Sequence, residues 1–167
     1  MLTVRKQSVA LKSGWIGLIS DTHGLVRPEA LAALKRSELI IHAGDIGNPE
    51  VLASLSAIAP VLAIRGNNDR EKWARQLPDV LRLRINGVKL HVIHNLRELE
   101  HGPVSNGIRA VISGHSHKPS IVEREQILFI NPGSAGPRRF KLPVAVGRIF
   151  VRGQTLRAQI LELKIQS

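Results

Sequence analysis

Residues 15–24 read WIGLISDTHG, a short apolar run that ends in a polar loop. This pattern is typical of a buried β-strand. Pro28 follows at a position that suits the first turn of a helix, which we expect to extend to Lys35. The same order then repeats, with a strand expected at Leu39–His42, a helix at 49–57 and a strand at 60–64. Alternating strands and helices predict a parallel sheet in this part of the chain.

The later chain has a different pattern, in which strands follow one another directly. Asn86-Gly87 lies between two apolar runs, 80–85 and 88–94, and is a strong signal for a β-hairpin. Further strands are expected at 109–113, 121–125, 127–131, 144–151 and 156–163. Hairpins after βα units predict either a mixed sheet or two packed sheets, with helices on the outer faces.

Length and composition fit one folded domain. The chain has 167 residues, 43% of them hydrophobic, and domains typically run to ~100–200 residues. We expect a loose basic extension at 1–13 and a single domain at 14–167. The chain has no cysteine, which excludes disulfides and thiolate metal ligands. No apolar run approaches the roughly 20 residues of a membrane helix, and 1–13 lacks the apolar core of a secretory signal, so the expected location is the cytoplasm.

The formal net charge of +11 has two interpretations. Arginines that alternate with leucines, as in Leu81-Arg82-Leu83-Arg84-Ile85, indicate a solvated face of a sheet, and we favour this interpretation. Alternatively, a basic surface attracts nucleic acid by neutralising its phosphates. The chain has no tyrosine and only five other aromatic residues, so it offers few platforms on which bases could stack.

Polar residues collect where five of the expected strands end. In open α/β sheets, sites form beyond the carboxyl ends of the strands. Each group alone also fits a turn or a helix cap. The groups share chemistry, however, because each offers carboxylate, imidazole or amide atoms: Asp21-Thr22-His23, Gly44-Asp45, Asn67-Asn68-Asp69, His94, and His115-Ser116-His117.

The types of these side chains indicate metal binding. Carboxylates, imidazoles and one amide oxygen suit manganese, iron, zinc or nickel. Seven ligands are too many for one catalytic ion with open positions, but they fit two ions that share a carboxylate. The remaining histidines are expected to have other roles: His42 supports its loop, His91 lies on the strand face opposite His94, and His101 is solvated.

In this order, the motifs resemble those of the calcineurin-like metallophosphoesterase superfamily. The similarity is greatest to its small single-domain branch of bacterial and archaeal phosphodiesterases, which includes the small subunit of retromer. It extends from about Gly14 to the end of the chain and also covers Asn131-Pro132-Gly133-Ser134. The resemblance implies an α/β fold, a two-sheet β-sandwich flanked by helices in four layers (αββα).

The resemblance also implies the metal ligands and the reaction. Asp45 would bridge two divalent ions, with manganese favoured and nickel, iron or zinc as alternatives. Two such ions can hold a hydroxide as nucleophile and clamp a phosphoryl oxygen. One ion would be held by Asp21, His23, Asp45 and His117, and the other by Asp45, Asn67, His94 and His115.

The chain departs from the family pattern at two positions. Many members have histidine directly after the ligand asparagine, where it protonates the leaving group, but here that residue is Asn68. General acid catalysis contributes typically ~10²–10⁴-fold, so we expect a preference for esters with good leaving groups. The family often shows His-Gly-His at the next motif, whereas here Asn95 follows His94 and the covering loop is short.

Further residues are candidates for contact with the reacting phosphate. Asn68 is placed in the catalytic and substrate-binding groups, and Asp69 is expected to orient water or substrate. Arg138 and Arg139, followed by Lys141, lie just after the Asn131–Ser134 turn and offer positive charge to a phosphate. A solvated basic loop is the alternative interpretation of these cations.

Three functions are compatible with the sequence. We favour metal-dependent hydrolysis of a phosphodiester, with a small or nucleotide-like phosphate ester as substrate. A non-catalytic scaffold on the same fold is the second, and a nuclease or nucleic-acid-binding protein is the third. No membrane partner is expected, and association of two copies through the strands after Ile121 is left open.

Overall fold

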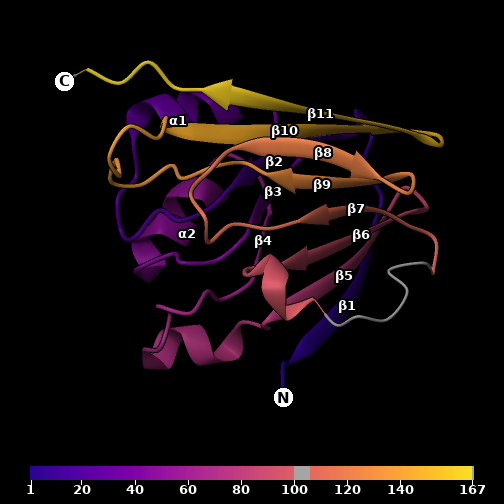
Figure 1. Cartoon of the computed structure of the whole chain (residues 1–167), viewed down its shortest axis with the longest axis horizontal. Coiled ribbons are helices and arrows are strands. Elements are labelled where there is room, and N and C mark those ends of the chain that lie inside the picture. Colours follow the sequence, from indigo (N-terminus) through magenta and orange to yellow (C-terminus); the bar gives the residue numbers. More distant parts are fainter. Residues whose placement is uncertain (100–105, 167) are drawn as a thin grey trace.

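The computed structural model describes residues 1–99 and 106–166 and consists of two packed β-sheets with helices on one side (Figure 1). The six-stranded sheet has the order β1-β5-β6-β7-β9-β8, and the five-stranded sheet has the order β11-β10-β2-β3-β4. The elements are β1 (Val4–Val9), β2 (Trp15–Ile19), α1 (Pro28–Leu34), β3 (Leu39–His42), α2 (Pro49–Ser56), β4 (Val61–Ala63), η1 (Lys72–Gln76), β5 (Val80–Ile85), β6 (Val88–Ile93), η2 (Leu96–Glu98), β7 (Ile108–Ile112), β8 (Ser120–Arg124), β9 (Ile127–Asn131), β10 (Ala145–Arg152) and β11 (Thr155–Glu162).

The main core lies between the two sheets. In β5, Leu81, Leu83 and Ile85 are buried in this core, while Arg82 and Arg84 alternate with them and are exposed. Burial of each large aliphatic side chain contributes roughly 1.5–3 kcal/mol. The alternation therefore fixes which face of β5 meets the other sheet, as the period of two predicted.

A second core lies between the five-stranded sheet and the two α-helices. Leu34 of α1 and Leu55 of α2 pack there against Ile40 of β3. Asn48 caps α2, because its side chain accepts a hydrogen bond from the backbone N–H of Val51. The predicted sandwich flanked by helices is confirmed. On the outer face of the six-stranded sheet, however, the only helical element in the described ranges is the 3-10 turn η2. None of the helices described has the length and apolar character needed to cross a membrane.

The expectation of a loose extension at 1–13 is wrong for residues 4–9, which form the edge strand β1. This strand pairs in parallel with β5, from Val4 opposite Val80 to Val9 opposite Ile85. The sequence of β1, VRKQSV, is almost entirely exposed, so it lacks the apolar alternation by which a strand is recognised. Backbone hydrogen bonds to β5, rather than burial of side chains, hold it in the sheet.

Asp79 anchors the start of β1. Its carboxylate accepts hydrogen bonds from the backbone N–H and the hydroxyl of Thr3, at 2.7 and 2.9 Å, and forms an ion pair with Arg65 at 2.6 Å. The hydrogen bond from Arg65 is the largest of the effects that lower the pKa of Asp79 to about 2. One carboxylate thus joins β1 to the segment that follows β4.

The topology brings five strand ends to one edge of the sandwich. Strands β2, β3 and β4 are parallel in one sheet, and β6 and β7 are parallel in the other. Because the two sheets are stacked, the loops after these five strands meet at the same end. The polar motifs identified in the sequence lie in these loops.

Candidate metal centre

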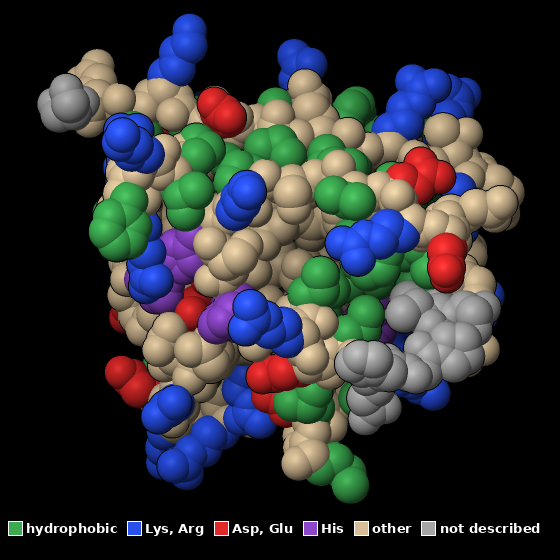
Figure 2. Space-filling view, in the orientation of Figure 1, with side chains coloured by type: hydrophobic (Ala, Val, Ile, Leu, Met, Phe, Trp, Pro, Cys, Tyr) green, Lys and Arg blue, Asp and Glu red, His purple; other side chains and the backbone are tan. Residues whose placement is uncertain are grey.

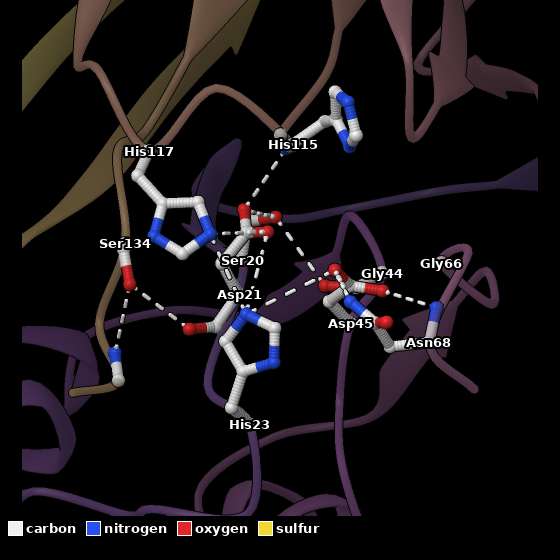
Figure 3. A network of polar contacts seen from close by, with 12 residues as sticks. Ser20, Asp21, His23, Gly44, Asp45, Gly66, Asn68, His115, His117 and Ser134 are labelled. Carbon is white, nitrogen blue, oxygen red and sulfur yellow. Dashed lines mark hydrogen bonds and ion pairs between the residues drawn. The ribbon is translucent and has the colours of Figure 1, made fainter. Parts of the chain in front are cut away.

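The carboxylates and imidazoles predicted as metal ligands converge at this edge. Asp21, Asp45, His23 and His117 point toward one another in Figure 3, although they come from the loops after three different strands. In the space-filling view, histidine and acidic side chains reach the surface together on the left of the molecule, with Lys and Arg around them (Figure 2). The convergence joins residues that are up to 96 positions apart in the chain.

Two groups of ligand atoms form within this site. In the first, Asp21, His23 and His117 offer atoms that all lie within 4.8 Å of one another. The Nε2 atom of His117 lies 3.2 Å from Asp21 Oδ1 and 3.4 Å from His23 Nε2. In the second, Asp21, Asp45 and His94 meet the same criterion. The Nε2 atom of His94 lies 3.3 Å from Asp45 Oδ2 and 3.9 Å from Asp21 Oδ1.

Asp45 and Asp21 both lie between the two groups. Asp45 Oδ2 is 3.9 Å from His23 Nε2 as well as 3.3 Å from His94 Nε2, so this carboxylate faces ligands of both expected ions. Asp21 also contributes to both groups, which the ligand assignment from the resemblance did not include. Its second oxygen, Oδ2, accepts hydrogen bonds from Ser20 Oγ at 2.7 Å and the His115 N–H at 3.1 Å. Oδ1 is therefore the oxygen that faces the site.

Asn67 and His115 lie beside these two groups. Asn67 Oδ1 is 3.1 Å from His115 Nδ1. The ring of His115 also lies edge-on to that of His94, with 5.3 Å between the ring centroids. His115 is exposed, and its ring points away from Asp21 in Figure 3. All seven predicted ligands are thus close together, with Asn67 and His115 on the solvent side.

The buried atoms of the site fit a cation. Asp21 Oδ1 and His94 Nε2 are buried and have no hydrogen-bond partner among the described residues. His94 Nδ1 lies 2.7 Å from the carbonyl oxygen of Ala43, so Nδ1 carries the proton and the lone pair of Nε2 faces Asp45. A lone pair facing a carboxylate is unfavourable unless a cation or a proton lies between them. A divalent ion satisfies this arrangement.

Without metal, a proton on His94 partly replaces the cation between its ring and the Asp45 carboxylate. Burial alone lowers the pKa of His94, but the carboxylates of Asp45 and Asp21 outweigh it and raise that pKa above its ordinary value. Burial also disfavours the charged form of Asp45 and by itself would raise its pKa. Hydrogen bonds from His94 and Asn68 outweigh this effect and hold the pKa well below its usual range. Asp45 is therefore ionised at neutral pH, as a metal ligand must be.

The backbone at the site is strained. Asp21, His23, Asp45, His115 and His117 have φ between 46° and 68°, in the left-handed region. Residues other than glycine rarely adopt this conformation, which persists only where the surrounding structure enforces it and clusters at functional sites. Asp21, His23, Asp45 and His117, which have this conformation, point their side chains toward one another just after the strands end (Figure 3). The sequence gives no signal for this conformation.

Gly44 is required by close packing as well as by its φ of 97°. A Cβ atom at this position would lie 2.7 Å from His94 Nδ1 and 2.8 Å from the backbone nitrogen of Gly66. Any side chain would therefore displace either the His94 ring or the loop after β4. The glycine directly before the Asp45 ligand is thus part of the geometry of the site.

His42 supports the Asp45 loop, as expected. It is fully buried, its Nδ1 accepts a hydrogen bond from the Gly44 N–H at 3.2 Å, and its Nε2 lies 2.9 Å from Thr22 Oγ1. Thr22 in turn donates to the carbonyl of Ile46 at 2.8 Å, so Nε2–H is the donor to Thr22. Burial is the largest of the effects that lower the pKa of His42 to about 4. The neutral ring links the loops that carry Asp21 and Asp45.

Asp69 has contacts that differ from the expected catalytic role. Its carboxylate is 5% exposed and accepts hydrogen bonds from the backbone N–H groups of Ile46, Gly47 and Gly66, at 2.8 to 3.0 Å. These donors belong to the loops after β3 and β4. The oxygens that were expected to orient water or substrate hold two loops together instead.

Asn68 acts on the Asp45 carboxylate. Its backbone N–H donates to Asp45 Oδ1 at 2.9 Å and its side-chain amide donates to Oδ2 at 2.8 Å (Figure 3). These bonds orient Asp45 toward the histidines. In this arrangement Asn68 is a positioning residue, with its amide already engaged.

Ser134 was noted only as part of a family motif, but it contacts the site directly. Its hydroxyl donates to the backbone carbonyl of Asp21 at 2.9 Å and accepts from the Gly136 N–H at 3.2 Å. The loop that follows carries Arg138 and Arg139, both exposed. Neither guanidinium contacts the ligand groups in the part of the chain that the structure describes, so a role in binding phosphate stays a prediction.

Comparison with known proteins places the chain in a family. A profile described as the calcineurin-like phosphoesterase superfamily domain matches residues 15–152. The chain belongs to this superfamily. A probable metallophosphoesterase of Methanothermobacter thermautotrophicus is 35% identical over 158 residues, which cover 87% of this chain and 91% of the relative. A probable metallophosphoesterase of Methanocaldococcus jannaschii is 38% identical over 132 residues, covering 71% and 67%.

Solved structures of the superfamily share the fold. An archaeal phosphodiesterase superposes with a TM-score of 0.72 at 26% identity, over 88% of this chain and 99% of the other. Vps29 from Chaetomium thermophilum also gives a TM-score of 0.72, over 89% and 96%, but at 16% identity it shows the fold alone. Membership of the superfamily makes this protein a metal-dependent phosphoesterase, with a phosphate ester as substrate.

Proposed function

We propose that this superfamily member is a dinuclear phosphodiesterase. The observation that carries the proposal is the position of Asp45, whose Oδ2 lies 3.3 Å from His94 and 3.9 Å from His23. A carboxylate between two sets of imidazoles is the arrangement that two ions sharing one ligand require. Manganese is favoured for the mixed carboxylate, imidazole and amide set, with nickel, iron and zinc as alternatives.

Seven side chains would hold the two ions. Asp21, His23 and His117 would hold the first ion together with Asp45, and His94, Asn67 and His115 would complete the second. When bound, such ions lower the pKa of a water molecule so that it attacks phosphorus near neutral pH, and they neutralise charge on the phosphoryl oxygens. Proteins of this kind need no nucleophile from a side chain.

The surrounding residues fix the ligands before substrate arrives. The Ala43 carbonyl sets the tautomer of His94, Asn68 orients Asp45, and Ser20 orients Asp21. Loss of such partners typically lowers metal affinity or activity by 10- to 100-fold, because the ligands then sample other orientations. We infer that these bonds, together with the left-handed backbone, preorganise the site.

The preference for diesters rests on Asn68. The side-chain amide of Asn68 donates one hydrogen bond to Asp45, and an amide does not supply a proton to a leaving group. Leaving groups that depart without protonation, such as nitrophenolate, are therefore favoured over alkoxides. The similarity to an archaeal phosphodiesterase supports this preference. Arg138 and Arg139 are proposed to attract the phosphate from the loop beside Ser134.

Two alternatives are less well supported. A non-catalytic scaffold is suggested by the likeness to Vps29, but a scaffold does not require seven converging candidate ligands, five of them with left-handed backbone. A nuclease is suggested by the charge of +11. Retention on duplex DNA that depends strongly on salt, with hydrolysis of DNA, would favour the nuclease.

Hydrolysis assays separate these functions. Metal-stripped protein is assayed with bis-p-nitrophenyl phosphate and p-nitrophenyl phosphate, with each of the four metals added in turn. The proposal predicts diester turnover that requires metal and exceeds monoester turnover. Faster monoester turnover would keep the enzyme but contradict the diester preference. No turnover of either ester with any metal would favour the scaffold.

A further inference from the structure

A groove of about 770 Å³ lies on the outer face of the six-stranded sheet, away from the metal-ligand edge. Its floor is formed by the neighbouring strands β1, β5 and β6, which Figure 1 shows side by side at the lower right. The volume is within the ~300–1,000 Å³ that is usual for sites of small molecules. His91 lines this groove, whereas His94, three residues later in the chain, belongs to the metal centre.

Cations are paired directly with cations across this floor. The register places Lys6 of β1 opposite Arg82 of β5, and Arg84 of β5 opposite Lys89 of β6. Like charges at directly opposite positions destabilise a sheet. Glu98 is the only acidic residue among the described residues that line the groove. A solvated sheet face has no need of two such pairs in neighbouring rows.

His91 provides a second and independent observation. It lies opposite Arg82, is only 7% exposed, and its Nδ1 has no hydrogen-bond partner among the described residues. Buried polar atoms in folded proteins are nearly always paired. Burial and, to a smaller extent, the charge of Arg82 lower the pKa of His91, so the ring is neutral and has a free nitrogen. A ligand in the groove would contact the accessible part of this neutral ring beside Arg82.

One end of the floor is apolar. Val4, Val80 and Ile93 form one row across β1, β5 and β6, directly next to the row of Lys6, Arg82 and His91. Leu99, after η2, packs against Val80 and Ile93. No aromatic side chain lines the groove in the described part of the chain, so it offers no stacking platform for single-stranded nucleic acid.

We propose that this groove is a second binding site, for a small organic anion that carries two or more adjacent phosphate groups and an uncharged body. The phosphates would lie beside Lys6, Arg82 and Arg84, whose charges would then share one anion; the Lys89 ammonium already donates to the Asn106 carbonyl at 2.8 Å. The uncharged body would lie against Val4, the exposed member of the Val4–Val80–Ile93 row. This site does not depend on the proposed reaction at the metal centre.

Calorimetry tests the proposal with ADP, pyrophosphate and adenosine as probes. The full chain is titrated both with manganese and after removal of metal, and the Asp45→Asn variant is titrated in parallel. We expect ADP to bind more tightly than pyrophosphate or adenosine in all three. Arg82→Gln combined with Arg84→Gln should weaken ADP binding by about tenfold or more. Arg152→Gln with Arg157→Gln, which removes the same charge from exposed positions on the other sheet, should change it less than about twofold.

His91→Leu provides a variant that does not change charge. It should weaken ADP binding while leaving the protein without ligand at least as stable, because it removes an unpaired buried nitrogen. The proposal is overturned if ADP binding disappears in Asp45→Asn, since the ligand then occupies the metal centre. It is also overturned if both double variants weaken ADP binding equally, or if duplex DNA binds this face more tightly than ADP does.

Discussion

The candidate metal centre and the groove differ in the charge of the groups that have no partner of opposite charge. At the metal centre, carboxylate oxygens and imidazole lone pairs converge, and buried atoms such as Asp21 Oδ1 have no donor. In the groove, cationic residues occupy directly opposite positions on neighbouring strands, as at Lys6 and Arg82. The first arrangement fits a cation and the second an anion. Unmatched groups thus indicate the charge of a ligand before any ligand is seen.

The backbone differs between the two regions as well. Ligands at the metal centre lie in loops with left-handed residues, whereas the residues of the groove lie in regular strands. Strained loops place a few atoms within a few ångströms, as a metal requires. A strand surface spaces its side chains regularly, about 6.7 Å apart at every second residue, and suits a larger and less directional ligand.

Loss of the shared carboxylate should have the largest effect. Asp45→Asn is expected to reduce diester turnover by more than the ~10–100-fold that follows loss of an outer-shell partner, because it removes a ligand that faces both ions. The fold should persist, since Asn68 can still bond the amide oxygen. Turnover at saturating manganese and circular dichroism check the two parts. Turnover within tenfold of the wild type would show that Asp45 does not bridge.

Restoring an acid next to the ligand asparagine should have the second largest effect. Asn68→His is expected to raise turnover of an alkyl monoester such as β-glycerophosphate by about tenfold or more, within the range for general acid catalysis. Turnover of bis-p-nitrophenyl phosphate should change little, because its leaving group needs no proton. Asn68→Ala is the control and should lower both. If Asn68→His lowered the turnover of both substrates to the same extent, the leaving-group argument would be contradicted.

Acid should weaken the metal-free protein through His42. The pKa of His42 is about 4 in the folded state and 6.5 in the unfolded chain, so the unfolded chain binds the proton more readily. The stabilisation is complete above pH 6.5 and is lost as the pH falls toward 4, by up to about 1.4 kcal/mol per pH unit. Denaturant unfolding across this window measures the slope. His42→Gln should be less stable at pH 7 but show a shallower slope.

Two other histidines, His91 and His94, also contribute to the pH dependence of stability. The lowered pKa of His91 adds to the same slope, whereas the raised pKa of His94 acts above pH 6.5 with the opposite sign. Between pH 6.5 and about 5 the slope comes mainly from the two buried neutral rings, and nearer pH 4 carboxylates with lowered pKa, such as Glu38 and Asp79, add to it with the same sign. An unchanged slope in His42→Gln would show that His42 does not carry the effect.

The smallest expected effect concerns the groove, where a substitution should stabilise the protein. Arg82→Gln without ligand should raise the free energy of unfolding by about 0.2–1 kcal/mol, because it removes the like charge opposite Lys6. Most surface substitutions are neutral or destabilising. Chemical denaturation at low salt should show the gain, and high salt should diminish it. A loss of stability at low salt would mean that Arg82 has a stabilising partner.

The sequence allowed most of the fold and the contents of the metal centre to be predicted. Apolar runs bounded by turn residues were sufficient for β2, β3, β5 and β6, because burial on at least one face imposes the pattern. The candidate ligands were recognisable because they directly follow β2, β3, β4, β6 and β7. By contrast, β1 was missed, since an exposed edge strand needs no apolar alternation.

Features that depend on pairing between distant residues could not be predicted. The role of Asp69 follows from three backbone donors in other loops, and the left-handed conformation of His117 follows from the loops around it. The groove depends on register: Arg82 and Arg84 were visible as an exposed stripe, but only the structure places Lys6 and Lys89 opposite them.

The most direct test of the dinuclear site is a crystal structure with manganese, with anomalous scattering recorded at the manganese edge. The account predicts two peaks about 3.5–4 Å apart, with the Asp45 carboxylate between them. His23 and His117 should lie on one ion, and His94 and His115 on the other. A single peak, or two peaks with no contact to Asp45, would contradict the proposed centre.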